Sequence, residues 1–557
     1  MKTMEIIKIN TKQTNKDYFK GYFSSHGIQI VIFVITFVLM SVVSFFNIAT
    51  SKTIVTFDIN EYEVGQVADR TITASKTIPE DDEYSFSIYK GETIIKKGFA
   101  ISEAGMQKLE RMASAPLYID WRAFANSMLV FLLVISLAVF LYSKPVCGYN
   151  IQVKEQIFLS IMFILVFAIT VFASKFSTFS TPFMLPVIIP SSFVIILITV
   201  LFGQKSAINF SFILGLGVLY AAPVSVVPSL FVLCAGIATV RIMRSIQHRM
   251  DMVSVSIVLG FLEAAFLFVF KIVYNNIDST TLFAVLGVAL NGFLSGILAL
   301  GFLTPLESLL NTPSIFRLTD LSDLNNPLMR KMLLVAPGTY NHSLLVAQLA
   351  EAACETIGAN AILARVGAYY HDIGKMEQPE YFAENQQGEN KHDDINPKMS
   401  VLVVRSHVKK GVEKAHAMRL PKEVIDIIEQ HHGNSLIQFF YYAAKKQGLE
   451  VTKEDYSYMG KPPTSREAAI IMLADTVEAA CRSLENPSVP RLEKFINKLV
   501  EKKNEDHQLD KSGLTFADID GIQQSFVTIL AGYYHSRVKY PNQTDPDEDE
   551  VPTVHEK

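Results

Sequence analysis

The first half of the chain consists of long apolar stretches, whereas the second half places apolar residues at helical spacing among many charges. A bilayer core about 30 Å thick needs about 20 apolar residues per helix, so the long stretches predict membrane-spanning helices. The first runs from Ile28 to Phe46. Seven more follow, for eight spans in all, near 125–143, 155–174, 183–203, 206–221, 224–241, 252–274 and 281–303. Pro223 and Pro228 leave open whether 206–241 is one broken span or two short ones; the parity of the spans favours two.

Basic residues indicate the orientation of these spans. Lysines at positions 2, 8, 12, 16 and 20 precede the first span, which we interpret as an uncleaved anchor. Alternate loops carry Lys144 and Lys154, then Lys205, then three arginines, while the remaining short loops carry only Lys175. By the positive-inside rule, both termini are expected in the cytoplasm of a multi-pass protein of the plasma membrane.

A polar segment, 48–122, separates the first two spans and is expected outside the cell. The patterns TIVTF and ETIIKKG predict short strands, and a helix is predicted near Ser102–Met112. Trp121 precedes the second span, where interfacial aromatic residues collect. The segment is either a small sensor domain or a folded loop without a ligand, and its extracellular ligand is unknown.

Two polar residues lie inside predicted spans. Glu263 lies in VLGFLEAAFLFVF and Asn291 in VALNGFL. Intramembrane ionisable groups are costly and face a protein interior or a ligand. For Glu263, packing against a polar neighbour is favoured over a signalling role.

After the last span, 305–336 reads as short connecting helices, and the chain is helical in pattern from Pro337 onward. Helical runs are predicted at 343–357, 360–371, 397–415, 421–432, 466–485 and 517–535. The chain has no GxxxxGK[ST] loop, which excludes a P-loop nucleotidase.

The predicted fold class is all-α: a polytopic membrane domain, then an all-helical cytoplasmic domain, with a small mixed extracellular segment. The expected domains are 1–27 (cytoplasmic), 28–47 (first transmembrane helix), 48–122 (extracellular), 123–304 (seven transmembrane helices), 305–336 (connector), 337–540 (catalytic domain) and 541–557 (acidic disordered tail).

Composition narrows the function. The chain has 557 residues, 50% of them hydrophobic, and a net charge of -4. No global basic field favours a nucleic-acid polymer as partner. The four cysteines show no paired spacing, which argues against both a disulfide framework and a cysteine-ligated zinc site.

Metal-ligating residue types recur in the last third of the chain, around the run YYHDIGK. Each has an ordinary alternative, such as a core histidine or a helix cap, but chance does not account for all of them together. Imidazole and carboxylate groups hold first-row divalent metals, and one carboxylate can bridge two ions. The candidate ligands are His342, His371, Asp372, His407, His431, His432 and Asp475.

The order of these residues resembles that of the HD-domain phosphohydrolases. The phrases VAPGTYNHSLLVAQLAE, YYHDIGK, YFAENQ, HVKKGVEKA, EQHHGNSLIQFFYYAAK and SREAAIIMLADTVEAACRSL resemble one branch, the membrane-bound 7TMR-HD family of PgpH-type bacterial cyclic di-AMP phosphodiesterases. No GYP follows the His-Asp pair as cyclic di-GMP enzymes require. The outer segment matches only the start and end of the family's extracellular domain and lacks its long middle.

The resemblance implies a two-metal site. His342, His371, Asp372 and Asp475 are expected to hold one ion, and Asp372 to bridge to a second ion held by His407, His431 and His432. The nitrogen and oxygen ligands favour Mn²⁺ or Fe²⁺. With His371 and Asp372, Lys375 is a candidate catalytic residue that binds phosphate or protonates the leaving oxygen, or else a solvated lysine. Tyr441 and Arg482 are candidate substrate-binding residues.

The leading hypothesis is a membrane-anchored enzyme that hydrolyses cyclic di-AMP to pApA in the cytoplasm, regulated through its membrane or extracellular part. One alternative keeps the chemistry but changes the substrate to another nucleotide or a short RNA. A third is a receptor whose helical domain only binds nucleotide. A homodimer is left open.

Overall fold

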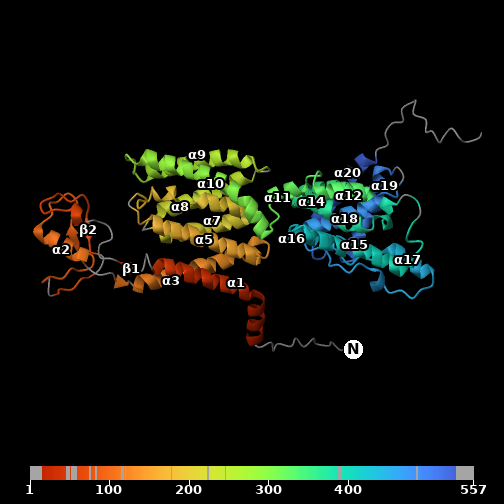
Figure 1. The fold of residues 1–557 in the computed structure, drawn as a ribbon, viewed down its shortest axis with the longest axis horizontal. Helices are drawn as coiled ribbons and strands as arrows, with labels where there is room; N and C mark the ends of the chain where they lie inside the picture. Colours follow the sequence, from red (N-terminus) through yellow and green to blue (C-terminus); the bar gives the residue numbers. More distant parts are fainter. Residues whose placement is uncertain are drawn as a thin grey trace, which may run out of the picture. The chain divides into compact units, whose positions relative to one another are not determined.

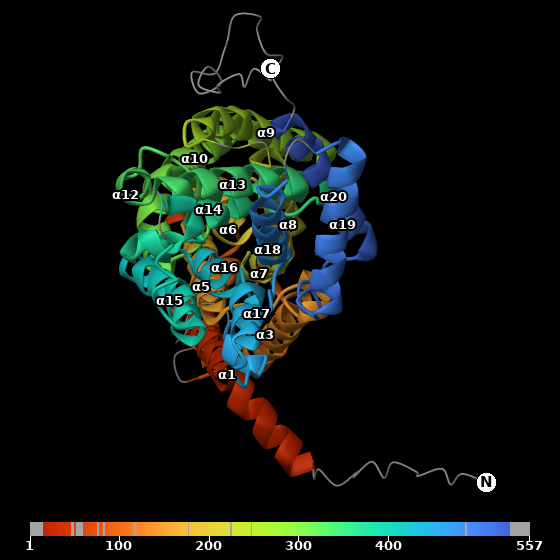
Figure 2. The same ribbon diagram turned by 90° about the vertical axis from the view of Figure 1, so that its right-hand side faces the viewer.

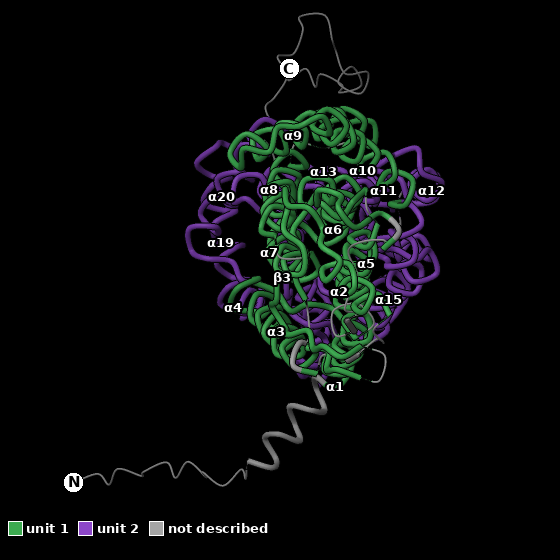
Figure 3. Tube along the Cα trace, turned by 90° about the vertical axis from the view of Figure 1, so that its left-hand side faces the viewer, with its two compact units in different colours: residues 1–303 green, residues 304–557 purple. Residues whose placement is uncertain are grey.

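The computed structural model describes residues 15–45, 50–51, 59–74, 77–81, 84–114, 118–119, 121–176, 178–222, 225–244, 246, 248–386, 388, 390–484 and 487–534. The predicted strand TIVTF, Pro223 and the acidic tail 541–557 lie outside these residues. The chain divides into two compact units, residues 1–303 and 304–557 (Figure 3).

The first unit combines a small subdomain of short strands and helix α2 with a set of long apolar helices (Figure 1). Its elements are α1 (Asn15–Ser44), β1 (Thr50–Ser51), η2 (Ile59–Glu61), β2 (Ile72–Thr73), β3 (Thr93–Ile95), α2 (Glu103–Ser114), β4 (Tyr118–Ile119), α3 (Trp121–Leu141), α4 (Lys144–Cys147), α5 (Val153–Ala173), η3 (Leu185–Val187), α6 (Ser191–Phe202), α7 (Gln204–Ala221), α8 (Val226–Met243), α9 (Asp251–Val273) and α10 (Thr281–Leu310).

The small subdomain has its own apolar core. Strand β2 pairs antiparallel with β3, with Ile72 opposite Ile95. Helix α2 buries Leu109 and Met112 against these strands and against Ile88. The predicted strand in ETIIKKG and the predicted helix near 102–112 are therefore confirmed. Strand β1 pairs with β4 and joins the two ends of the segment.

Within the described residues, six helices are long and apolar enough to cross a membrane: those at 27–44, 124–141, 153–173, 226–243, 251–273 and 281–310. The predicted spans 183–203 and 206–221 are not among these six. The stretch 183–203 is a 3-10 turn followed by the 12-residue helix α6, because Pro186 and Pro190 interrupt it. The stretch 206–241 is two separate helices, α7 and α8, and not one broken span.

The polar residues inside the membrane part have partners. Ser192 Oγ donates a hydrogen bond to Glu263 Oε1, which supports the packing interpretation for that carboxyl group. Asn291 Nδ2 lies 3.2, 3.0 and 3.0 Å from the backbone oxygens of Pro186, Val187 and Ile189. These carbonyls belong to the interrupted stretch, so Asn291 satisfies backbone groups that a continuous helix would have paired.

The second unit is all-helical. Its elements are α11 (Ile315–Leu321), α12 (Pro327–Val335), α13 (Pro337–Ile357), α14 (Ala361–Tyr370), η4 (Ile373–Glu377), η5 (Pro379–Tyr381), η6 (Ala383–Asn385), α15 (Pro397–Ala417), α16 (Lys422–Gln430), α17 (Gln438–Lys446), η7 (Glu454–Tyr456), α18 (Arg466–Cys481), α19 (Val489–Glu505) and α20 (Phe516–Tyr533).

Helix α18 forms the centre of this unit and packs against α13, α14, α16 and α19 (Figure 2). Its residues Ile470 to Ala474 are fully buried, as expected for a helix surrounded on all sides. Ser465 caps its first turn by accepting a hydrogen bond from the Ala468 amide. All six helical runs predicted from the sequence are confirmed. Helices α17 and α19 were not predicted from the sequence; the buried face of α19 is only a thin stripe of Leu492, Ile496 and Val500.

Candidate metal centre

The structure brings the seven predicted ligands together from three helices and from the ends of two others. His342 lies on α13, His407 on α15 and Asp475 on α18, while His371-Asp372 ends α14 and His431-His432 follows α16. Potential ligand atoms form two sets, His342, His371 and Asp372, and Asp372, His407, His431 and His432, each with its atoms within 4.8 Å of one another. Asp372 is common to both sets.

The two carboxylate oxygens of Asp372 face different sets of histidines. Oδ2 lies 3.7 Å from His342 Nε2 and 3.2 Å from His371 Nε2. Oδ1 lies 3.4 Å from His407 Nε2 and 3.7 Å from His431 Nε2. A carboxylate placed in this way offers one oxygen to each of two neighbouring cations.

Asp475 also lies between the two sets. Its Oδ1 is 3.1 Å from His342 Nε2, and its Oδ2 is 3.5 Å from His432 Nδ1. The carboxylate comes from α18, the most buried helix of the unit, so its position is fixed by the core.

Hydrogen bonds to backbone carbonyls orient three of the imidazole rings. The Nδ1 atoms of His371, His407 and His431 lie 2.7, 2.5 and 2.8 Å from the carbonyl oxygens of the residues three positions earlier. An Nδ1–H that donates to a carbonyl leaves the Nε2 lone pair free to coordinate a metal. Each ring is therefore held in the tautomer that a metal ligand requires.

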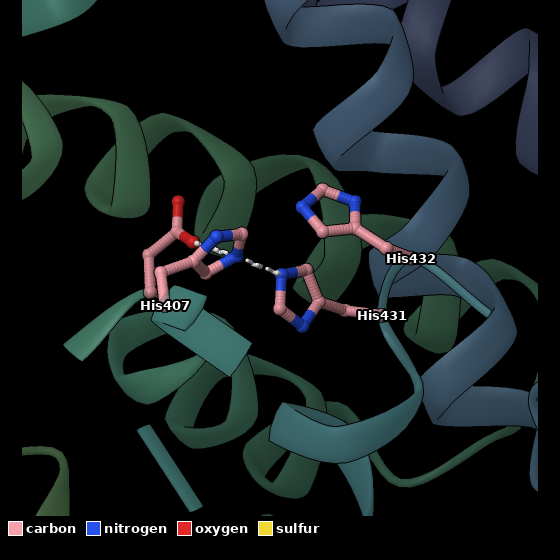
Figure 4. Close-up of side chains that lie close together, drawn as sticks. His407, His431 and His432 are labelled. Carbon is pink, nitrogen blue, oxygen red and sulfur yellow. Dashed lines mark hydrogen bonds and ion pairs between the residues drawn. The ribbon is translucent and has the colours of Figure 1, made fainter. Parts of the chain in front are cut away.

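The Nε2 atoms of His407 and His431 face each other at 3.3 Å (Figure 4). Since both rings donate from Nδ1, both facing atoms are acceptors when the rings are neutral, and a cation between them resolves the conflict. His342 Nε2, His371 Nε2 and Asp372 Oδ1 are likewise buried without a hydrogen-bond partner among the described residues. Buried hydrogen-bond acceptors without a partner are rare in proteins. The nitrogen and oxygen atoms at this site therefore fit the coordination of divalent metal ions.

Electrostatics favours the ligand forms of Asp372, His407 and His432, whereas Asp475 and Glu478 outweigh burial and raise the pKa of His342 to about 10. Burial would raise the pKa of the Asp372 carboxyl, but His371 and Lys375 outweigh it and hold the pKa well below its usual range. Burial lowers the pKa of His407 to about 3 and that of His432 well below its ordinary value. The carboxylate is charged and these two rings are neutral, as metal coordination requires.

Lys375 is not a solvated lysine. Its Nζ lies 2.7 Å from Asp372 Oδ2 and 2.9 Å from Glu384 Oε1, and 5.0 Å from the centre of the Phe382 ring. Burial opposes its charge, but the two carboxylates outweigh it and raise the pKa of the ammonium group above its ordinary value. Lys375 is a buried positive charge at the edge of the centre.

The two predicted substrate-binding residues lie farther out. Tyr441, on α17, packs with Tyr456 at 6.0 Å between ring centres, in a small apolar cluster of its own. Arg482 donates to Glu478 Oε1 at 2.5 Å. Arg482 therefore contacts Glu478, which in turn contacts the candidate ligand His342.

Sequence reasoning missed three residues that contact the centre. Glu478 Oε2 lies 2.5 Å from His342 Nδ1, one helical turn after Asp475 on the same face of α18. Tyr458 stacks on His432 at 4.1 Å between ring centres, and Glu384 pairs with Lys375. The spacing of Glu478 from Asp475 was a usable signal, because residues three apart share a helix face.

Replacing Glu478 by alanine is expected to weaken metal binding by about 10- to 100-fold, because outer carboxylates that orient a ligand histidine contribute this much. The change removes the acceptor of His342 Nδ1 and leaves the ligand ring free to turn. Titration of Mn²⁺ into the purified variant, followed by electron paramagnetic resonance, measures the affinity.

The matched control is Glu493→Ala, which truncates an exposed glutamate on α19. Equal affinities for the two variants would show that Glu478 does not support the centre.

The fold and the centre together define a membrane protein that carries a helical HD domain with ligands suited to divalent metal ions. Residues 339–480 match the HD domain family, and residues 121–314 match the family described as 7TM receptor with intracellular HD hydrolase. Over both its membrane part and its helical domain, the chain is therefore similar to membrane proteins with an intracellular HD hydrolase domain.

Two curated relatives are named cyclic-di-AMP phosphodiesterase PgpH. The one from Bacillus subtilis is 47% identical over 46% of this chain and 36% of its own length. The one from Listeria monocytogenes is 30% identical over 82% of this chain and 64% of its own length. The chain thus spans between about a third and two thirds of these relatives. A solved structure of the Listeria PgpH HD domain in complex with cyclic-di-AMP is 43% identical, covers 38% of this chain and 99% of its own, and has a TM-score of 0.37.

Proposed function

We propose that the chain is a membrane-anchored phosphodiesterase that hydrolyses cyclic di-AMP to pApA with two divalent metal ions. The observation that carries the proposal is the placement of Asp372, whose two oxygens face two separate sets of buried histidines. Such a shared carboxylate is typical of two-metal sites that cleave phosphate esters.

In this proposal His342, His371, Asp372 and Asp475 hold one ion, and Asp372, His407, His431 and His432 hold the other. Two such ions lower the pKa of a shared water and neutralise phosphate oxygens. The ligand set contains nitrogen and oxygen atoms and no thiolate, which favours Mn²⁺ or Fe²⁺. The four free cysteines, at 147, 234, 354 and 481, are not among the described ligand atoms of the centre.

Three further side chains are proposed to act on the substrate. Lys375 Nζ is held next to Asp372 and supplies a positive charge for a phosphate oxygen or a proton for the leaving 3′-oxygen. Tyr441 is proposed to contact a base, and Arg482 a phosphate or ribose oxygen. A cavity of about 630 Å³ lies beside His432 and Tyr458, with Lys409 on its wall, and has room for a nucleotide.

The substrate is supported by the two relatives named as cyclic-di-AMP phosphodiesterases. The orientation is supported by the basic loops, which favour cytoplasmic termini and give the domain access to a cytoplasmic dinucleotide.

The proposal predicts that the purified full chain in detergent, supplied with Mn²⁺ or Fe²⁺, converts cyclic di-AMP to pApA. Chelation of the metal should remove the activity and metal addition should restore it, because the hydroxide and the charge neutralisation both depend on the ions. Chromatography of the products measures the conversion.

Cyclic di-GMP, linear pApA and a short RNA serve as parallel substrates. Cleavage of one of these without cleavage of cyclic di-AMP would assign a different substrate to the same centre. Nucleotide binding with no cleavage of any of them, in protein loaded with metal, would favour a receptor.

A further inference from the structure

The membrane unit contains a cavity of about 570 Å³ between α1, α3, α5 and α7. Helix α1 packs against α3 and α5, and α7 packs against the same two helices, so the four surround the space (Figure 1). Small side chains at Ala138 and Ser160 line it and leave it open. Its volume lies within the range of roughly 300–1,000 Å³ that is usual for small-molecule sites.

The lining of the cavity is amphipathic. Aromatic and aliphatic side chains form most of the wall, namely Phe33, Met40, Val134, Leu159, Phe163 and Ile213. Polar groups gather at one end of the cavity, at the middle of α1, the start of α5 and the end of α3: Gln29, Ser143, Lys144, Asn150 and Gln156. A ligand that fills the cavity must therefore be apolar over most of its length and polar at one end.

Gln156 indicates what the polar end must offer. Its side chain is 3% exposed, and its Nε2 donates to the Gln29 carbonyl oxygen at 2.9 Å. Its Oε1 is buried and has no hydrogen-bond partner in the described part of the chain. A buried acceptor without a partner is costly, so a ligand that carries a hydroxyl or amine donor is favoured here.

Lys144 indicates the charge of the ligand. It is exposed at the start of α4, lines the same end of the cavity and forms no ion pair with a described residue. Basic pockets between transmembrane helices bind anionic lipid headgroups. Lys144 belongs to the loops whose charge predicts the cytoplasmic side, and the anionic lipids of the cytoplasmic leaflet are at hand there.

We propose that this cavity binds one anionic phospholipid whose headgroup carries free hydroxyl groups. The phosphate lies near Lys144, a headgroup hydroxyl donates to Gln156 Oε1, and an acyl chain follows the apolar wall. A zwitterionic choline lipid has no net charge for Lys144 and no hydroxyl for Gln156. A soluble dinucleotide does not match the apolar wall.

Native mass spectrometry of the full chain in detergent tests the proposal without reference to phosphodiesterase activity. Dioleoyl phosphatidylglycerol and dioleoyl phosphatidylcholine are added separately. One tightly held phosphatidylglycerol per chain is expected, with weaker and unsaturable binding of phosphatidylcholine. Equal binding of the two lipids would mean that only ordinary surrounding lipid is present and would overturn the proposal.

Two pairs of variants locate the lipid. Lys144→Gln should weaken phosphatidylglycerol binding about fivefold, the contribution of one basic residue near an anionic headgroup. Lys175→Gln, at the other end of α5, should leave binding unchanged. Ala138→Phe fills the cavity and should abolish the one-to-one complex, whereas Ala125→Phe, on an exposed position of the same helix, should not.

A melting curve in detergent shows whether Ala138→Phe folds. If it does not fold, the comparison of Lys144→Gln with Lys175→Gln still tests the proposal. Equal phosphatidylglycerol affinities of Lys144→Gln and Lys175→Gln would contradict the proposal.

Discussion

Replacing Asp372 by asparagine is expected to lower cyclic di-AMP hydrolysis by at least about a thousandfold, because metal ions supply several kcal/mol of transition-state stabilisation. The two oxygens of Asp372 face different histidine sets, at 3.2 Å from His371 Nε2 and 3.4 Å from His407 Nε2. An asparagine amide must turn its NH₂ group towards one of these sets. An NH₂ group is not a metal ligand, so one of the two ions loses its bridge in either orientation.

The measurement combines two readouts on the purified full chain. Product chromatography gives the rate, and elemental analysis gives the metal content, which should fall by about one ion per chain if Asp372 bridges two ions. Lys375 keeps Glu384 as its partner in the variant, so the local ion pair survives in part. Asp394→Asn, an exposed carboxyl in the same unit, is the matched control. Unchanged rate and unchanged metal content in Asp372→Asn would reject the bridged centre.

The residue types of the centre could be predicted from the sequence because few other functions gather histidine and aspartate in this order. The ordinary alternatives for these histidines are excluded by their burial, which the sequence alone does not show. His431 is fully buried and His432 largely so. Burial depends on α18 and the loop that ends at Tyr458, which lie far along the chain.

The supporting residues were harder to predict. Glu478 and Glu384 are ordinary acidic residues in sequence, and only the fold places them against His342 and Lys375. In the membrane part, the apolar stretch 183–203 has the composition of a span, but its two prolines shorten the helix to 12 residues. Hydrophobicity predicts that a segment is buried in lipid or protein, whereas local backbone chemistry decides its form.

Gly374 lies two residues after Asp372, in η4, which packs against α15. A glycine just after the end of a helix ordinarily permits a turn with positive φ. Gly374 lies in the 3-10 helix η4 and is not among the glycines with positive φ. A side chain is excluded by contact instead, because a Cβ at this position would lie 1.8 Å from the His407 carbonyl oxygen and 2.7 Å from the Gly411 amide nitrogen.

Replacing Gly374 by alanine is therefore expected to destabilise the unit by about 3 kcal/mol or more, at the upper end of the cost of overpacking. Both contacting atoms are backbone atoms of α15, so no side-chain rotation relieves the clash, and α15 must move away from η4. Helix α15 carries His407, so the same movement pulls a candidate ligand away from Asp372. The free energy of unfolding in denaturant and the metal affinity should both fall.

Gly532→Ala is the matched control for this change. Gly532 lies near the end of α20, and a Cβ there meets nothing within 4 Å. Alanine at that position is expected to alter the free energy of unfolding by no more than about 0.5 kcal/mol. If Gly374→Ala unfolds at the same denaturant concentration as Gly532→Ala, the close approach of η4 and α15 does not hold in solution. If stability falls while metal affinity stays unchanged, α15 yields at Gly411 and not at His407, and the clash is absorbed away from the centre.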